Sequence, residues 1–237
     1  MEKRALRPIT RLSTEAQATL SLREHILSGA LKPGERLTET PLAEQLGIAR
    51  ATLRMGLHRL ASEGILVQIP YTGWQVVALS ADDVWELWTL RSSLESLASR
   101  LAAERMTDSG SSRVTKAMED LSAACRRGRV NDINKADFAF HRTIVDLAGH
   151  GRLSEHYRQV EQQVRLYIAS TNVYNEPDDW SVVIEHHRPL AAALIARDPD
   201  RSEAEARLHN EVFGKKLLSA MRDEPHALPD RARPARS

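Results

Sequence analysis

Residues 37–64 read LTETPLAEQLGIARATLRMGLHRLASEG, and this stretch decides the fold of the first third of the chain. Its apolar residues recur three or four positions apart, as on one buried face of a helix, in two groups on either side of a glycine: Leu42 and Leu46, then Leu53, Leu57 and Leu60. Pro41, Gly47 and Gly64 mark where the two helices begin and end. The pattern predicts a short helix, a tight turn and a second helix over about 50–63, which is a helix-turn-helix.

The flanking sequence adds a helix in front and a β-hairpin behind. The preceding helical pattern ends at Gly29 and the turn Lys32–Gly34. Two runs that favour β-structure, 66–69 and 74–77, flank a Pro-Tyr-Thr-Gly turn. Because helices followed by a hairpin form a wing, we predict a winged helix-turn-helix domain over residues 19–79.

The rest of the chain has a helical pattern and no convincing strand. Ser80, with Asp83 three residues on, begins a helix with an apolar stripe at spacings of three and four. Similar segments follow at about 112–127, 131–148, 152–170, 180–197 and 201–221. We therefore predict a mainly α protein whose second domain, 80–222, is an all-helical bundle of six to seven helices. We expect residues 1–18 and 223–237 to be flexible tails, the latter because it is rich in Pro, Arg and Asp.

Composition excludes several classes of protein. Cys125 is the single cysteine, so the chain cannot form an internal disulfide or a cysteine-ligated metal site. No apolar run approaches the roughly 20 residues that a membrane span requires, and the start has no apolar signal segment. We expect a cytoplasmic protein without a membrane partner. The net charge is +1, but residues 1–79 hold 10 Lys/Arg against 7 Asp/Glu, so the slight basic excess lies in the winged domain.

The exposed face of the second helix carries the candidates for reading DNA. Arg50 and Arg54 lie four apart with Thr52 beside them, opposite the leucines. An arginine that binds guanine through two hydrogen bonds gives about 1–3 kcal/mol of discrimination. We expect further contacts from the hairpin tip and from the residues ahead of the first short helix: Thr72, Gly73, Arg36 and Thr38. A solvated arginine face is the plain alternative, but the ordered turn, helix and wing favour double-stranded DNA as partner.

Four residues of the helical half form a candidate metal site. Asp137 and His141 lie four apart and leave one face of their helix, while His187 and His209 lie on the last two helices. Three imidazoles and a carboxylate are suitable ligands for Zn, Ni, Mn or Fe, and they leave coordination positions on the metal open for a further ligand. Spacing alone favours a simpler account, in which Asp137 and His141 form a surface pair and His187 and His209 are ordinary polar residues of their helices.

Three segments resemble a known family: LREHILSGALKPGERL at 22–37, LAEQLGIAR at 42–50 and LASEG at 60–64. They resemble the DNA-binding domain of GntR-type bacterial transcriptional regulators, and the helical half resembles the ligand-sensing domain of the FadR/FCD branch, together over about 19–221. The resemblance implies that Arg50, Thr52 and Arg54 read the operator and that Gly73 lies at the wing tip.

Two residues depart from the pattern of that family. Ala49 stands where relatives usually have the Ser or Thr that caps the helix, and the loss of such a cap typically costs about 1 kcal/mol. Thr40 stands where an Arg is frequent. The operator sequence of this protein is therefore expected to differ from that of its relatives.

The resemblance also implies a ligand set in the second domain. Many FCD domains carry Asp-x-x-x-His, His-Arg and a last-helix His, which match Asp137, His141, His187-Arg188 and His209. His187 rather than His186 is chosen because Arg188 follows it. Such domains bind small carboxylates at the metal, and Arg91 and Arg165 are the expected effector contacts, although Arg91 is equally suited to pair with Glu95.

These features predict a bacterial transcription regulator, most simply a repressor, that binds an inverted-repeat operator as a homodimer and responds to a small organic acid at a divalent metal site. One alternative is a regulator whose effector is the ion itself. Another is a metal-dependent hydrolase or lyase, but no motif places a general base, and catalysis would leave the winged domain unexplained.

Overall fold

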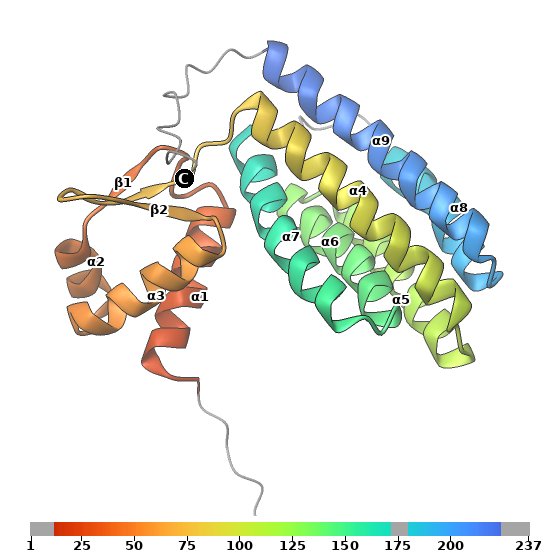
Figure 1. The fold of residues 1–237 in the computed structure, drawn as a ribbon, viewed down its shortest axis with the longest axis horizontal. Helices are drawn as coiled ribbons and strands as arrows, with labels where there is room; N and C mark the ends of the chain where they lie inside the picture. Colours follow the sequence, from red (N-terminus) through yellow and green to blue (C-terminus); the bar gives the residue numbers. More distant parts are fainter. Residues whose placement is uncertain (1–11, 172–179, 224–237) are drawn as a thin grey trace, which may run out of the picture. The chain divides into compact units, whose positions relative to one another are not determined.

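The computed structural model describes residues 12–171 and 180–223, which form two compact units divided between Val77 and Ala78 (Figure 1). Each unit has its own core. The division falls just ahead of the boundary expected between residues 79 and 80. Among the described residues, no helix is both long and apolar enough to cross a membrane.

The first unit contains three helices and a small antiparallel sheet. Its elements are α1 (Thr14–Leu27), β1 (Arg36–Leu37), α2 (Glu39–Leu46), α3 (Arg50–Ser62), β2 (Leu66–Ile69) and β3 (Gly73–Val76). The strand order is β1-β3-β2, with β1 and β2 each antiparallel to β3. Gly47 ends α2 in the left-handed conformation, with φ 64°, and so makes the sharp turn into α3.

The core of the first unit fixes the orientation of α3. Leu53, Leu57 and Leu60 are fully buried, together with Trp74 from β3. Gly56 lets α1 approach closely, because a Cβ there would lie 2.7 Å from Oγ1 of Thr19. With this face of α3 turned inward, the face that carries Arg50 and Arg54 is left exposed.

The structure differs from two expectations in this unit. Helix α1 begins at Thr14, within the range 1–18 that was expected to be a tail, because Ser13 caps it by accepting a hydrogen bond from the Ala16 amide at 3.1 Å. Strand β1 was not expected, since two residues are too few for a periodic pattern. Residues 1–11 and 224–237 lie outside the described residues, and Asp223 is the last residue of α9.

The described part of the second unit consists of six helices, in the order and near the positions that the sequence predicts. They are α4 (Ala81–Glu104), α5 (Asp108–Arg127), α6 (Val130–Leu147), α7 (Gly151–Thr171), α8 (Ser181–Ile195) and α9 (Pro199–Asp223). Ser80 and Asp83 form the capping box that starts α4. The long helix α4 packs against α6, α7, α8 and α9, most extensively against α9 (Figure 1).

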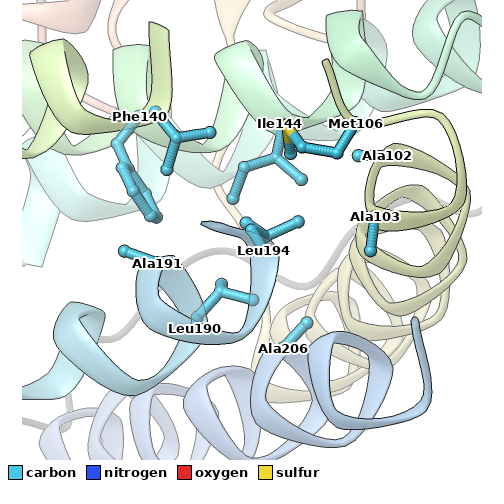
Figure 2. Close-up of a cluster of buried hydrophobic side chains, with 10 residues drawn as sticks. Ala102, Ala103, Met106, Phe140, Ile144, Leu190, Ala191, Leu194 and Ala206 are labelled. Atoms are coloured by element: carbon cyan, nitrogen blue, oxygen red, sulfur yellow. The ribbon is translucent and has the colours of Figure 1, made fainter. Parts of the chain in front are cut away.

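Small apolar residues let the helices of this bundle approach one another closely. Figure 2 shows a cluster that contains Ala102 and Ala103 of α4, Phe140 and Ile144 of α6, Leu194 of α8 and Ala206 of α9. A polar centre lies beside this cluster, where the ring of Phe140 contacts those of His141 and His187. Its buried polar side chains are Arg91, Glu95, Asp137, His141, His187 and Asn210.

Candidate DNA-reading face and candidate metal centre

A groove in the first unit brings together five of the residues expected to contact DNA. Its volume is about 540 Å³, and it lies between α3, the start of α2 and the β2–β3 hairpin. The five expected residues in its lining are Thr38, Arg50, Arg54, Thr72 and Gly73. Arg36, on β1, and Thr52, on α3, lie outside this lining, Arg36 exposed and Thr52 half-buried.

Glu39 organises the polar groups of this groove. Its carboxylate accepts hydrogen bonds from Arg54 at 2.8 and 2.6 Å, from Arg50 at 3.3 Å and from the indole nitrogen of Trp74 at 3.3 Å. The bond from Arg54 is the main reason that the pKa of Glu39 falls to about 2. The guanidinium of Arg54 is thus held in place without DNA, whereas that of Arg50, with one long hydrogen bond, is held more loosely.

Sequence reasoning missed Glu39, and it also missed His58 and Tyr71, which line the same groove. The signal for His58 was present, because it continues the spacing of Arg50 and Arg54 by four more residues. Glu39 gave no signal, since its partners lie 11, 15 and 35 residues away in the chain.

The structure brings the three expected histidines of the second unit together. His141 on α6, His187 on α8 and His209 on α9 offer ring nitrogens that all lie within 4.8 Å of one another. Asp137 joins them, because its Oδ1 lies 2.9 Å from Nε2 of His187. His186 is exposed and outside this group, so the geometry selects His187 of the two neighbours.

Each of these imidazoles has an acceptor facing its Nδ1. Nδ1 of His141 lies 3.0 Å from Oε2 of Glu95, that of His187 lies 2.7 Å from the carbonyl oxygen of Val183, and that of His209 lies 3.2 Å from the carbonyl of His186. The tautomer with its proton on Nδ1 suits these oxygens, and in that tautomer each ring would offer Nε2 to a metal. Nε2 of His187 lies 3.3 Å from Nε2 of His141 and 2.9 Å from Oδ1 of Asp137.

The charges of this centre suit a divalent cation. Burial alone would raise the pKa of Asp137, but the contact with His187 and the nearby guanidinium of Arg91 hold that pKa well below its ordinary value, so Asp137 is a carboxylate. Burial and the two neighbouring imidazoles lower the pKa of His209 well below its usual value, so that ring is neutral. A cation between a carboxylate and neutral imidazoles would be stabilised by both. The residues therefore fit a metal by their donor chemistry.

Glu95 connects this centre to four helices. Its carboxylate, on α4, accepts hydrogen bonds from Arg91 at 2.6 Å, from the hydroxyl of Tyr157 at 2.9 Å and from the amide of Asn210 at 2.8 Å, in addition to its contact with His141. Burial opposes the charge of Glu95, yet Arg91 and His141 hold its pKa well below the ordinary value. Such a partner fixes the tautomer and orientation of a metal-binding histidine.

The two expected effector arginines lie around one aromatic ring. The guanidinium of Arg91 lies 5.3 Å from the centroid of Phe138 and that of Arg165 lies 5.6 Å from it. Arg91 makes the expected pair with Glu95 and also lies near enough to Asp137 to stabilise its charge. Arg165 lies 3.8 Å from Glu161. The contacts thus tie Arg91 directly to the histidine cluster, through Glu95 and Asp137.

Comparisons with known proteins match the two units separately. Residues 14–76 match the bacterial regulatory proteins of the gntR family, and residues 86–212 match the FCD domain. Among solved structures, E. coli McbR/YncC is similar with a TM-score of 0.76 and 25% identity, over 88% of this chain and 99% of that one.

Curated relatives cover both units. The Nta operon transcriptional regulator of Aminobacter aminovorans is 29% identical over 81% of this chain and 88% of its own length. The probable D-xylose utilization operon transcriptional repressor of Paenarthrobacter nicotinovorans is 28% identical over 82% of this chain and 84% of its own. The family and these relatives are transcription regulators, which removes the hydrolase or lyase alternative. The chain is a DNA-binding regulator that belongs to the gntR family of bacterial regulatory proteins and carries an FCD domain.

Proposed function

We propose that this regulator represses transcription from an inverted-repeat operator, to which it binds as a cytoplasmic homodimer, and that a small carboxylate bound with a divalent metal in the second unit releases it. The observation that carries the proposal is the convergence of ring nitrogens from three histidines, within 4.8 Å of one another, beside the Asp137 carboxylate. Polar groups are costly to bury in an apolar bundle, and a bound cation would offset that cost here.

The residues that would hold the ion are Asp137, His141, His187 and His209. The ion would supply a Lewis-acidic centre with positions open to carboxylate oxygens. Glu95 orients His141, and Arg91 adds a guanidinium suited to pair with an acid. The names of two relatives, one for the nta operon and one for D-xylose utilization, support a small metabolite as the effector of this protein too.

Helix α4 offers a route from the effector to the DNA. It begins at Ala81, close in sequence to the end of the first unit at Val77, and it carries both Arg91 and Glu95. An acid that draws Arg91 toward the metal changes the bonds of Glu95, and with them the position of α4. We infer that this movement lowers operator affinity, and couplings of about 1–3 kcal/mol change occupancy about 5- to 150-fold.

The test is a gel-shift titration with DNA from the regulator's own promoter region, with Zn²⁺, Ni²⁺ or Mn²⁺ and a panel of small organic acids. We expect one acid to weaken binding, only when metal is present. His187→Ala removes both metal binding and the response, whereas the matched control His186→Ala keeps both, because His186 is exposed outside the cluster.

Two outcomes of this titration count against the proposal. If no acid changes the binding of metal-loaded protein, the protein does not sense carboxylates. If metal alone changes DNA affinity at micromolar concentration, the effector is the ion. Equal metal binding by His187→Ala and the unchanged protein, measured by calorimetry, contradicts the assigned site.

A further inference from the structure

Tyr71 stands out at the tip of the β2–β3 hairpin. Its φ is 64°, in the left-handed region, and its side chain is 107% exposed. Left-handed backbone is rare and strained for a bulky residue and is normally left to Gly or Asn. Full exposure means that no packing within this unit compensates for the strain.

Within residues 12–171 and 180–223, one other residue that is not glycine has left-handed backbone, and its conformation has a structural reason. Arg197, with φ 58°, makes the turn between α8 and α9, and its guanidinium binds the carboxylate of Asp108. Tyr71 makes no hydrogen bond to any residue that the structure describes. Residues held in strained conformations without internal compensation cluster at functional sites.

The position of Tyr71 fits a contact with the wall of a DNA groove. It lines the same groove as Arg50 and Arg54, from the side of the hairpin. When a recognition helix enters the major groove, about 12 Å wide, the sugar–phosphate strands lie along its two edges. A side chain on the rim of the protein groove therefore meets a strand rather than base edges.

Besides Thr72, residues 66–73 offer two neutral side-chain donors that line the groove, Gln68 on β2 and Tyr71 at the tip, and Tyr71 is the fully exposed one. Residues 66–73 contain no Lys or Arg, so a phosphate contact from the wing must use a neutral group. The hydroxyl of Thr72 donates to the carbonyl of Ile69 at 3.4 Å, as does its amide at 3.2 Å. We propose that the Tyr71 hydroxyl donates to a backbone phosphate of the bound operator, while its ring lies against the adjacent sugar, and that its strained backbone holds it in place for this contact.

The inference rests on binding of duplex DNA by the winged unit, and the test separates the two claims. Affinity of the full chain is measured for two duplexes of equal length, one selected by the unchanged protein from a random library and one of random sequence, at several salt concentrations. The variants are Tyr71→Phe and Tyr71→Asn, with Val67→Thr as control, because Val67 is exposed on the same hairpin but does not line the groove.

Tyr71→Phe is expected to weaken binding to both duplexes about tenfold, because a hydrogen bond to a charged group is lost. The salt dependence stays unchanged, because a neutral side chain releases no counterion. Tyr71→Asn weakens binding at least as much and yet raises the Tm by about 2–4 °C, since Asn tolerates left-handed backbone. Val67→Thr changes neither affinity.

A variant such as Tyr71→Asn that raises stability and lowers DNA affinity is the result expected for a strained residue that contacts DNA. Unchanged affinity of Tyr71→Phe for both duplexes overturns the inference, because this variant lacks only the hydroxyl. Arg50→Ala still weakens binding if α3 reads DNA. If Tyr71→Phe weakens binding to the selected duplex alone, Tyr71 contacts bases and not phosphates, and this result also overturns the inference. Failure of the unchanged protein to bind either duplex contradicts the DNA-binding function itself.

Discussion

At the scale of single residues, Glu39 controls what the reading face offers to DNA. One half-buried carboxylate binds both arginines that face the groove, so it offsets part of their positive charge while it fixes their direction. An arginine held in this way loses less side-chain entropy on binding a base. Glu39 is thus a positioning residue, which favours a specific duplex over an arbitrary one.

The pKa of Glu39 gives a pH dependence with a definite sign. Because its pKa is about 2 in the folded protein and 4.5 ordinarily, its ionised form stabilises the first unit above pH 4.5, and this stabilisation is lost as the pH falls toward 2. Glu39→Gln lacks this contribution. We expect the Tm of the first unit to be lower in Glu39→Gln at pH 6, and the difference to shrink between pH 5 and pH 3. A difference that is independent of pH would contradict the assignment.

The same variant is expected to bind DNA with less discrimination. Removal of the carboxylate adds one net positive charge beside Arg50 and Arg54, so affinity for random-sequence DNA rises and the salt dependence steepens. The preference for a selected duplex falls, because the arginines are no longer oriented. Glu44→Gln is the matched control, since Glu44 is exposed on α2 and does not line the groove; equal behaviour of the two variants would rule out positioning by Glu39.

At the scale of elements, the contact between α4 and α9 positions the side chains that these two helices contribute to the polar centre. The indole of Trp88 lies against Gly214, where a Cβ would come within 2.1 Å of the ring, and its nitrogen donates to the carbonyl of Asn210 at 2.6 Å. Asn210 in turn donates to Glu95. Position 214 therefore requires glycine because the Trp88 ring lies so close. Within a helix, alanine would otherwise stabilise the helix by about 1 kcal/mol relative to glycine.

Gly214→Ala is expected to lower the free energy of unfolding by about 1–3 kcal/mol, because the hydrogen-bonded Trp88 ring cannot move aside without losing its partner. Urea denaturation measures this change. Gly151→Ala is the control, since no heavy atom lies within 4 Å of a Cβ at position 151 of α7; it leaves stability equal or slightly higher. A neutral Gly214→Ala would show that α4 and α9 separate easily.

At the scale of the whole molecule, the second unit leaves an apolar surface on two adjacent helices. Arg100 binds Asp200 and Glu203 while Trp88 binds Asn210, so α4 and α9 run antiparallel. Their exposed sides carry Leu90, Leu97, Leu208 and Val212. Exposed apolar side chains on adjacent helices favour a protein interface over solvent, and we propose that these residues form the contact between protomers of the proposed homodimer.

Leu97→Glu combined with Leu208→Glu is expected to convert the dimer into monomers, because carboxylates would be buried against their own symmetry copies. Sedimentation velocity at micromolar concentration measures the mass. Val182→Glu, which changes an equally exposed residue on α8, leaves the dimer intact. Operator affinity falls with dimer dissociation, since two half-sites are then bound independently. An unchanged mass of the double variant would remove this face as the interface.

The sequence by itself determined the elements and the identity of most functional groups. Leucine spacing, the Gly47 turn and the Ser80–Asp83 capping box act within a few residues, so each helix near these signals is predicted from local chemistry. The pair Asp137 and His141 was found for the same reason, because four residues make one helical turn. His187 and His209 could be assigned to the site only through the family resemblance. They lie on two different helices, and their separation in sequence does not show whether their side chains lie close together.

Only the tertiary structure decided how those groups are held. Glu95 draws its partners from positions 62 and 115 residues away, and Glu39 meets Trp74 from 35 residues away. No periodicity encodes such contacts, because they depend on which helix faces which after the apolar surfaces have packed. The clustered histidines, the oriented arginines and the exposed Tyr71 follow from that packing, and they bring polar residues that are distant in sequence into two candidate sites.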